Sequence, residues 1–232
     1  MIKKAQVGII GAMKPETDTL IEKLSEKETH FVGGITFTFG YLFEKSVVVA
    51  TCGVGKVFAA MCAQAMILSF SPDMIINTGV AGTLSDKIQI GGTVVACEVV
   101  QHDMDTSPLG DPVGLISGIN IVDIPCAPHL VKSLCECVTA LDIPCLCGKV
   151  ASGDSFICKN EQKEYIKNTF SAVACEMEGA AIGQVCYVNG VDFCVLRSIS
   201  DGGDENAQMD YPTFVDMAAK KSISVLCEFL KK

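Results

Sequence analysis

The chain has 232 residues, of which 49% are hydrophobic and 19% are charged, which suits one domain with a sizeable buried core. We therefore treat residues 1–232 as a single domain. Acidic side chains outnumber basic ones by 27 to 18, and the formal charge of -9 disfavours nucleic acid or an anionic membrane as a partner. No apolar run reaches the ~18 residues that cross a bilayer as a helix, so we expect a protein without a membrane span.

Short runs rich in β-branched residues predict strands, because each ends in Gly, Ser, Asp or another turn-forming position. These runs span 6–12, 46–52, 74–78, 93–100, 149–152 and 193–199. Several are apolar at successive positions, which is typical of a central sheet covered on both faces. Residues 33–44 alternate more clearly and predict an antiparallel hairpin or sheet edge.

Helical periodicity lies between the strands, at 16–27, 57–70, 127–140, 159–168, 177–189 and 212–230. For the last helix we expect Asp210 as the N-cap and Pro212 in the first turn. Strands that alternate with helices predict an α/β layered sandwich. The Gly-, Pro- and Asp-rich segment 104–121 is the candidate for a long functional loop or a subunit-facing segment.

Three glycine turns follow predicted strands, at 8–13, 53–56 and 79–82. The second is not a P-loop, which needs Gly at 50 and Ser or Thr at 57, and Phe58 excludes a dinucleotide fingerprint. Two interpretations stay open for it. The glycines make a tight turn with positive φ, or the backbone there approaches a ligand at the carboxyl end of the sheet.

Acidic residues follow several predicted strands and should converge at the carboxyl edge of the sheet. They are Glu16, Glu176, Glu178 and Asp201. Small apolar neighbours around the pair at 176 and 178 predict partial desolvation and a raised pKa, or a bound ligand. The alternatives are a solvated helix N-terminus for this pair and a simple strand end for the aspartate.

The remaining chemistry-bearing residues do not predict a metal or a catalytic triad. Thirteen cysteines form no CxxC pair, so we expect reduced, largely buried thiols in the cytoplasm. His102 lies beside Asp103, yet lacks a second His or Cys at ligand spacing, so structural hydrogen bonding is expected instead. No serine lies in a GxSxG elbow. This leaves acid and base chemistry on carboxylates, with no metal and no cofactor.

Together, the motifs resemble those of bacterial 5′-methylthioadenosine/S-adenosylhomocysteine nucleosidases, in order and spacing, over nearly the whole chain. They are Gly8 to Met13 with Glu16, Gly53 to Lys56, Ile75 to Gly79, Ser152 to Ile157, Glu176 to Glu178, and Arg197 to Asp201. The resemblance implies a nucleoside phosphorylase-like fold, which is a three-layer α/β/α sandwich with a mixed central sheet. It also implies a homodimer and an adenine thio-nucleoside as substrate, cleaved by water at its N-glycosidic bond.

The resemblance also implies roles for single residues. Asp201 would act as the acid at adenine N7, oriented by Ser200, and Glu16 would activate the water. Glu178 would hold the ribose hydroxyls, with Glu176 as a supporting acid. Further substrate-binding positions are Phe156 stacked on adenine, Ile157 at its Watson–Crick edge, Met177 on the ribose, Met13, Val54 and Tyr211 towards the thioether side, and Arg197.

Two departures from the family concern the substrate pocket. Val80 replaces a serine of relatives, and residues 101–112 differ, with Leu109 the expected apolar contact on the 5′ side. Three alternatives to this function remain: a phosphate-dependent purine nucleoside phosphorylase, an aminofutalosine-type nucleosidase, and a non-catalytic nucleoside-binding protein. Arg197 is the only arginine, which favours water over phosphate as the nucleophile.

Overall fold

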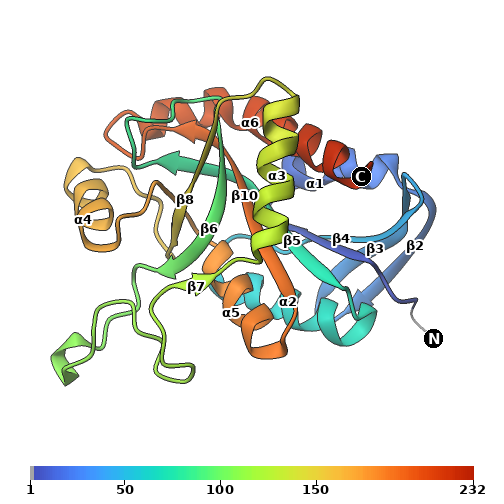
Figure 1. The fold of residues 1–232 in the computed structure, drawn as a ribbon, viewed down its shortest axis with the longest axis horizontal. Helices are drawn as coiled ribbons and strands as arrows, with labels where there is room; N and C mark the ends of the chain where they lie inside the picture. The colour runs from blue at the N-terminus through green and yellow to red at the C-terminus, as the bar shows by residue number, and fades with distance from the viewer. Residues whose placement is uncertain (1–2) are drawn as a thin grey trace.

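The computed structural model describes residues 3–232, which form one sheet between two layers of helices (Figure 1). The strands are β1 (Val7–Gly11), β2 (Ser25–Val32), β3 (Ile35–Leu42), β4 (Lys45–Thr51), β5 (Met74–Thr83), β6 (Thr93–Gln101), β7 (Ile124–Pro125), β8 (Cys145–Ser152), β9 (Ala174–Glu176) and β10 (Asp192–Asp201). The helices are α1 (Lys14–Lys23), α2 (Lys56–Phe70), the 3-10 turn η1 (Ser107–Leu109), α3 (Pro128–Ala140), α4 (Asn160–Phe170), α5 (Gly179–Asn189) and α6 (Ala207–Leu230).

The sheet mixes parallel and antiparallel pairs and runs in the order β10-β6-β8-β9-β5-β1-β4-β3-β2. β5 is its centre, because it pairs in parallel with β1 and β10, and its end pairs antiparallel with β9. Because β10 pairs with both β5 and β6, the strands β5, β10, β6, β8 and β9 close into a ring. This closure brings the carboxyl ends of β1, β5 and β10 together with the start of the glutamate-rich turn after β9.

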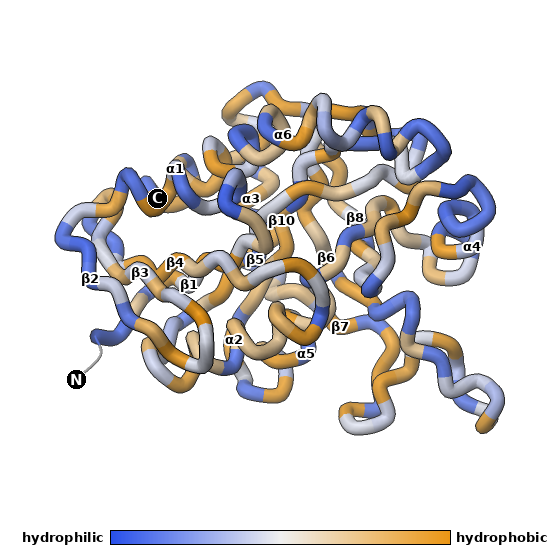
Figure 2. The backbone as a smooth tube through the Cα atoms, turned by 180° about the vertical axis from the view of Figure 1, so that it is seen from behind, coloured by the Kyte–Doolittle hydropathy of each residue, from blue (hydrophilic) through white to orange (hydrophobic). Residues whose placement is uncertain are grey.

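Helices cover both faces of the sheet. Figure 1 shows α2 and α5 side by side on one face, with α1, α3 and α6 on the other. The central strands are buried along their whole length, as in β1, where all of Val7 to Gly11 is buried. Hydrophobic residues therefore line both faces of the sheet, while polar residues concentrate on the outer helices and loops (Figure 2). None of the helices in the described part of the chain combines the length and hydropathy needed to cross a membrane.

The sandwich expected from the sequence is confirmed, but two of the predicted helices have an end that is wrong by several residues. The helix expected at 16–27 ends at Lys23, because Leu24 is extended and Ser25 already pairs with β3. The last helix begins at Ala207 with Asn206 as N-cap, so Asp210 lies inside the helix and is not its cap. Pro212 is then an internal proline, which removes one backbone donor from a helix that packing on β10 and β5 holds in place.

Candidate active site

A cavity of about 90 Å³ opens where β1, β5 and β10 end and where α1 and α5 begin. Parallel strands direct the residues at their carboxyl ends to the same edge, so side chains from distant parts of the chain meet here. All twelve residues expected at the site line this cavity: Met13, Glu16, Val54, Phe156, Ile157, Glu176, Met177, Glu178, Arg197, Ser200, Asp201 and Tyr211.

Glu16 reaches the cavity from the first turn of α1, which begins directly after β1. Its carboxylate accepts hydrogen bonds from the backbone N–H of Ala12 at 2.7 Å, of Met13 at 2.9 Å and of Val80 at 3.1 Å. The side chain is 1% exposed, and this burial raises its pKa above 4.5, against the attraction of Arg197 and the backbone donors. The result is a fixed, desolvated carboxylate that binds a proton more readily than a carboxylate in water.

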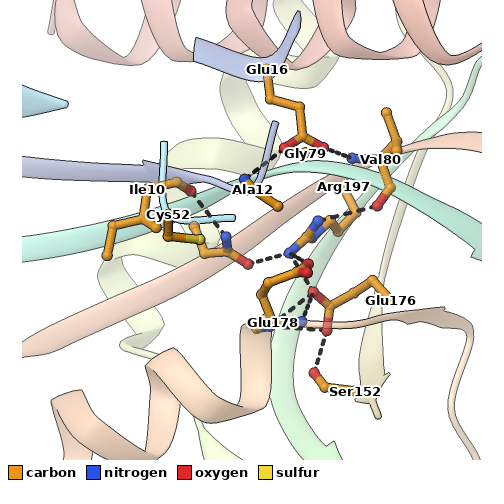
Figure 3. Close-up of polar contacts among 12 residues, drawn as sticks. Ile10, Ala12, Glu16, Cys52, Gly79, Val80, Ser152, Glu176, Glu178 and Arg197 are labelled. Atoms are coloured by element: carbon orange, nitrogen blue, oxygen red, sulfur yellow. Dashed lines mark hydrogen bonds and ion pairs between the residues drawn. The ribbon is translucent and has the colours of Figure 1, made fainter. Parts of the chain in front are cut away.

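Arg197 lies between the carboxylates and links them electrostatically, as Figure 3 shows. Its guanidinium donates to the Val80 carbonyl at 3.2 Å, pairs with Glu176, and lies 3.5 Å from Glu178. It also donates to the side-chain oxygen of Asn77, whose amide nitrogen is anchored to the Ile10 carbonyl at 2.9 Å. The terminal nitrogens of this buried arginine are thus occupied by protein groups.

Glu176 is fully engaged by its surroundings. Besides Arg197, it accepts hydrogen bonds from the Ser152 hydroxyl and from the backbone N–H groups of Glu178 and Gly179. These donors belong to the end of β8 and the first turn of α5, where backbone N–H groups lack helical partners. Glu176 therefore fixes the turn that presents Glu178.

Glu178 is the N-cap of α5, and its carboxylate faces the cavity. One oxygen accepts a hydrogen bond from the backbone N–H of Gly55 at 2.8 Å, and the other lies near Arg197. Burial raises its pKa to about 7, with Arg197 opposing and Glu176 adding to the rise. Gly55 has φ +100°, as the tight-turn interpretation predicts, and its backbone N–H contacts a residue that lines the cavity. The approach of this backbone to a ligand stays a prediction.

Asp201 ends β10, lines the cavity and is 3% exposed. One carboxylate oxygen accepts the Ser200 hydroxyl at 2.8 Å, and the other accepts the backbone N–H of Gly203 at 2.9 Å. Burial raises its pKa above 3.8, although both hydrogen bonds favour the charged form. Asp201 is thus held rigidly, in an environment that favours its protonated form more than water does.

The remaining wall is apolar and aromatic. Phe156 is 43% exposed, and its ring meets that of Tyr211 edge to face, with 5.5 Å between the ring centroids. The Tyr211 hydroxyl donates to the Met13 sulfur at 3.2 Å, which closes this side of the cavity. Ile157, Met177 and Val54 complete the wall, so a flat or apolar ligand group would lie against carbon and sulfur rather than charge.

Sequence reasoning missed Asn77 as the residue that tethers Arg197, and it missed Ser155 and Cys175 in the lining. Asn77 lies inside an apolar strand, and a buried polar residue in such a run was the available signal. Leu109, expected as an apolar contact, is 84% exposed and lies outside the cavity of its own chain, because η1 belongs to a segment that extends from the body (Figure 1).

His102 also differs from expectation. Its Nε2 is buried and has no hydrogen-bond partner within residues 3–232, so the expected structural hydrogen bond is absent at this atom. Among these same residues, no group of three or more His, Cys, Asp or Glu side chains is placed to hold a metal ion.

Comparison with known proteins identifies the family to which a chain with this site belongs. A sequence profile of the phosphorylase superfamily matches residues 6–231. The chain is 37% identical over 229 residues to a 5′-methylthioadenosine/S-adenosylhomocysteine nucleosidase of Shewanella halifaxensis, covering 98% of this chain and 99% of that one.

Solved structures agree with the sequence comparison. The S-adenosylhomocysteine nucleosidase of Streptococcus pyogenes, in complex with 5-methylthiotubericidin, superimposes with a TM-score of 0.94 at 33% identity, covering 98% of this chain and 97% of that one. The futalosine hydrolase of Helicobacter pylori superimposes with a TM-score of 0.93 at 36% identity, covering 99% and 98%. On these matches, the chain belongs to the 5′-methylthioadenosine/S-adenosylhomocysteine nucleosidase family of the phosphorylase superfamily.

Proposed function

We propose that this protein hydrolyses the N-glycosidic bond of 5′-methylthioadenosine and S-adenosylhomocysteine, releasing adenine and a 5′-thio-ribose. Water is the nucleophile and no cofactor takes part. The observation that carries the proposal is the convergence of three buried carboxylates, Glu16, Glu178 and Asp201, on one cavity with an apolar wall. The names of the relatives give the same reaction class.

Asp201 is the proposed general acid. Breaking the bond leaves negative charge on the departing adenine, and an acid at N7 neutralises it. The raised pKa of Asp201 supports this role, because a buried carboxyl group keeps its proton to a higher pH than an exposed one. Ser200 and Gly203 donate hydrogen bonds to the two carboxylate oxygens of Asp201 and would orient this carboxyl group towards the adenine.

Glu16 is the proposed general base, and Glu178 the proposed ribose ligand. Burial strengthens Glu16 as a base, and its backbone donors fix it at the position where a water would be activated. Glu178 would accept hydrogen bonds from the ribose hydroxyls. Its negative charge, when ionised, would also stabilise the positive charge that develops on the ribose in the transition state.

The apolar wall is the proposed specificity element. Phe156 would stack on adenine, the backbone of Ile157 would read its Watson–Crick edge, and Met177 would pack on the ribose. Met13, Val54 and Tyr211 would face the 5′-thio substituent, which suits an alkylthio group better than a hydroxyl. Arg197 and Glu176 would position the carboxylates rather than touch the substrate, because the terminal nitrogens of Arg197 and the carboxylate oxygens of Glu176 are engaged with each other and with the protein.

Phosphorolysis is the nearest alternative, and the cavity disfavours it. A phosphate site needs free cationic donors, whereas Arg197 is occupied and the described lining includes no lysine. Glu16 would repel a phosphate dianion from the same space.

The test is adenine release from methylthioadenosine in phosphate-free buffer, with and without added phosphate. We expect equal rates in both buffers, and strict dependence on phosphate would overturn the hydrolase. Glu16→Gln should lose activity, while Glu22→Gln, on the exposed side of α1, should keep it. Tight binding of the nucleoside with no turnover would instead identify a non-catalytic binding protein.

Aminofutalosine hydrolysis is a second candidate, because a futalosine hydrolase of Helicobacter pylori is among the structural neighbours at 36% identity. Aminofutalosine differs from the proposed substrates only on the 5′ side of the ribose. There an apolar wall favours a thioether over a polar group. Turnover numbers for the three nucleosides, measured at equal concentration, separate the two candidates.

We further propose a homodimer formed through α2 and α5. These neighbouring helices expose several large apolar side chains: Val57, Phe58, Met61, Leu68, Tyr187 and Val188. Exposed apolar side chains gathered on neighbouring elements are typical of a protein interface. Light scattering should give twice the mass of 24.6 kDa, and Phe58→Asp should shift the protein to the monomer. A monomeric wild-type protein at assay concentration would contradict the proposal.

We place this activity in the cytoplasm, as a step of methionine salvage and nucleoside catabolism. All thirteen cysteines are free in the structure, as expected for a reducing compartment.

A further inference from the structure

The turn between β10 and α6 follows Asp201 directly and begins with two glycines, Gly202 and Gly203. The backbone N–H of Gly203 donates to one carboxylate oxygen of Asp201 at 2.9 Å. Burial raises the pKa of Asp201, and this hydrogen bond is the largest contribution that opposes the rise. The peptide group that carries the N–H therefore affects both the position and the acidity of the Asp201 carboxyl group.

Lys163 binds the other end of the same peptide group. A trans peptide bond joins the carbonyl of Gly202 to the N–H of Gly203, so the two groups point in opposite directions from one rigid plane. The Lys163 ammonium donates to the Gly202 carbonyl oxygen at 2.8 Å. A positive charge at the carbonyl oxygen polarises the peptide and strengthens its N–H as a donor, because hydrogen bonds in a chain reinforce one another.

The turn needs an external contact of this kind. Glycine has more conformational freedom than any other residue, and Gly203 has φ +60°, in the left-handed region. Two consecutive glycines therefore supply little rigidity of their own to the backbone that meets Asp201. The hydrogen bond from Lys163 fixes the orientation of the peptide plane between them.

Lys163 itself is held beside the turn by α4. Its side chain is 15% exposed, and its ammonium lies 3.8 Å from the Asp204 carboxylate in the same turn. α4 contacts the turn a second time, because the backbone N–H of Asn160 donates to the Glu205 carboxylate at 3.2 Å. Lys163 lies outside the lining of the cavity. Its path to the proposed general acid therefore runs through the turn and not through the substrate.

We propose that Lys163 is a positioning residue for Asp201: its ammonium group fixes and polarises the Gly202–Gly203 peptide, which in turn holds the carboxyl group that protonates the departing adenine. The inference rests on the proposed function, in which Asp201 is the general acid. A general acid acts in the transition state and contributes little to substrate binding. A misplaced acid therefore lowers kcat and leaves KM nearly unchanged.

The test measures steady-state adenine release from methylthioadenosine by Lys163→Met, which keeps the apolar stem of the side chain and removes the ammonium group. We expect kcat to fall about tenfold and KM to stay within about twofold of wild type, because a small misplacement of a reacting group is costly in the transition state. Lys163→Gln, a shorter and uncharged replacement, should lose kcat in the same way. Lys163→Arg keeps a cationic donor and should restore most of kcat.

Lys167→Met is the matched control. Lys167 lies one turn further along α4, is partly exposed, and pairs with Glu164 rather than with the glycine turn. Its kcat and KM should equal those of the wild type. Circular dichroism confirms that each variant is folded.

A double variant separates an effect on Asp201 from a general structural effect. Where Asp201→Asn has already removed the acid, adding Lys163→Met should change kcat by less than about twofold, because the two residues act through one group. A tenfold loss in both backgrounds, a change in KM alone, or an unchanged kcat in Lys163→Met beside a slow Asp201→Asn would overturn the role of Lys163 and leave the proposed function standing. An unchanged kcat in Asp201→Asn would overturn the proposed acid and the role of Lys163 with it.

Discussion

At the scale of single residues, the carboxylates of the cavity differ in their hydrogen-bond partners and in the effect of burial on them. Glu176 is saturated by donors and paired with Arg197, so it has no free hydrogen-bonding capacity for a ligand. Glu16 and Asp201 are buried with backbone or hydroxyl donors on their oxygens, and burial raises the pKa of both. Cleavage of a glycosidic bond requires an acid and a base at one cavity, and Asp201 and Glu16 both line this one.

Replacing Asp201 with Asn tests the proposed acid. Asparagine keeps the size and the hydrogen bond from Gly203 but carries no acidic proton, so kcat should fall at least ~100-fold. Asp216→Asn, at an exposed position of α6, should leave kcat unchanged. Steady-state adenine release gives both values, and full turnover in Asp201→Asn would remove this residue from the mechanism.

Glu178 makes the stability of the protein depend on pH in a defined direction. Its pKa is about 7 in the folded chain against 4.5 ordinarily, so between these values the folded state binds more protons than the unfolded state. The stability contributed by Glu178 is therefore present at low pH and is lost as the pH rises through about 7, by at most about 3 kcal/mol.

Glu178→Gln removes this titration. The free energy of unfolding of the variant relative to wild type should therefore increase between about pH 5 and about pH 8. Urea unfolding at the two pH values measures it, with Glu22→Gln as an exposed control whose difference should not change. A pH-independent difference for Glu178→Gln would show that its carboxyl group titrates normally in the folded protein.

At the scale of elements, β5 and β10 build the centre of the site together. Their parallel register sets Gly79 directly beside Arg197. A Cβ at residue 79 would lie 2.5 Å from both an Arg197 nitrogen and a Glu16 oxygen. A small residue there is required for the guanidinium and the carboxylate to approach the strand.

We expect Gly79→Ala to destabilise the protein by about 1–3 kcal/mol, because overpacking forces neighbouring groups to move. Activity should fall with it, since the displaced groups are Arg197 and Glu16. Gly118→Ala is the matched control, because a Cβ there meets no atom within 4 Å. Urea unfolding and adenine release measure the two effects, and wild-type behaviour of Gly79→Ala would show that the site does not need this close approach.

The elements also show what sequence patterns can predict. The apolar strands ending in glycine or polar residues were readable, because burial on both faces leaves a continuous hydrophobic signature, as in Val47 to Ala50. β2 could not be predicted from the sequence, because residues 25–29 are mostly polar and exposed. This segment is a strand only through its pairing with β3. The start of α6 was misplaced because Pro212 usually marks a first turn, whereas here tertiary packing supports an internal proline.

At the scale of the molecule, the cavity depends on the whole chain. Glu16 comes from the first helix, Glu178 from the start of α5, and Asp201 from the end of β10. The carboxylates themselves were readable from the sequence as polar residues after strands. The contact of Asn77 with Arg197, which holds the arginine between the glutamates, could not be predicted from the sequence. It joins residues 120 positions apart and depends on how β5 pairs with β10.

Because the helices and strands that carry these residues all pack on or belong to one sheet, we expect residues 1–232 to unfold as one cooperative unit. Far-ultraviolet circular dichroism and tyrosine fluorescence should give coincident urea transitions at a fixed protomer concentration. A methylthioadenosine analogue that is not hydrolysed, at 100 times its dissociation constant, should shift both transitions together by about 2.7 kcal/mol, because it binds only the folded cavity. Two separate transitions, or a shift in one probe alone, would mean that part of the sheet folds without the site. The three carboxylates would then not belong to a single structural unit.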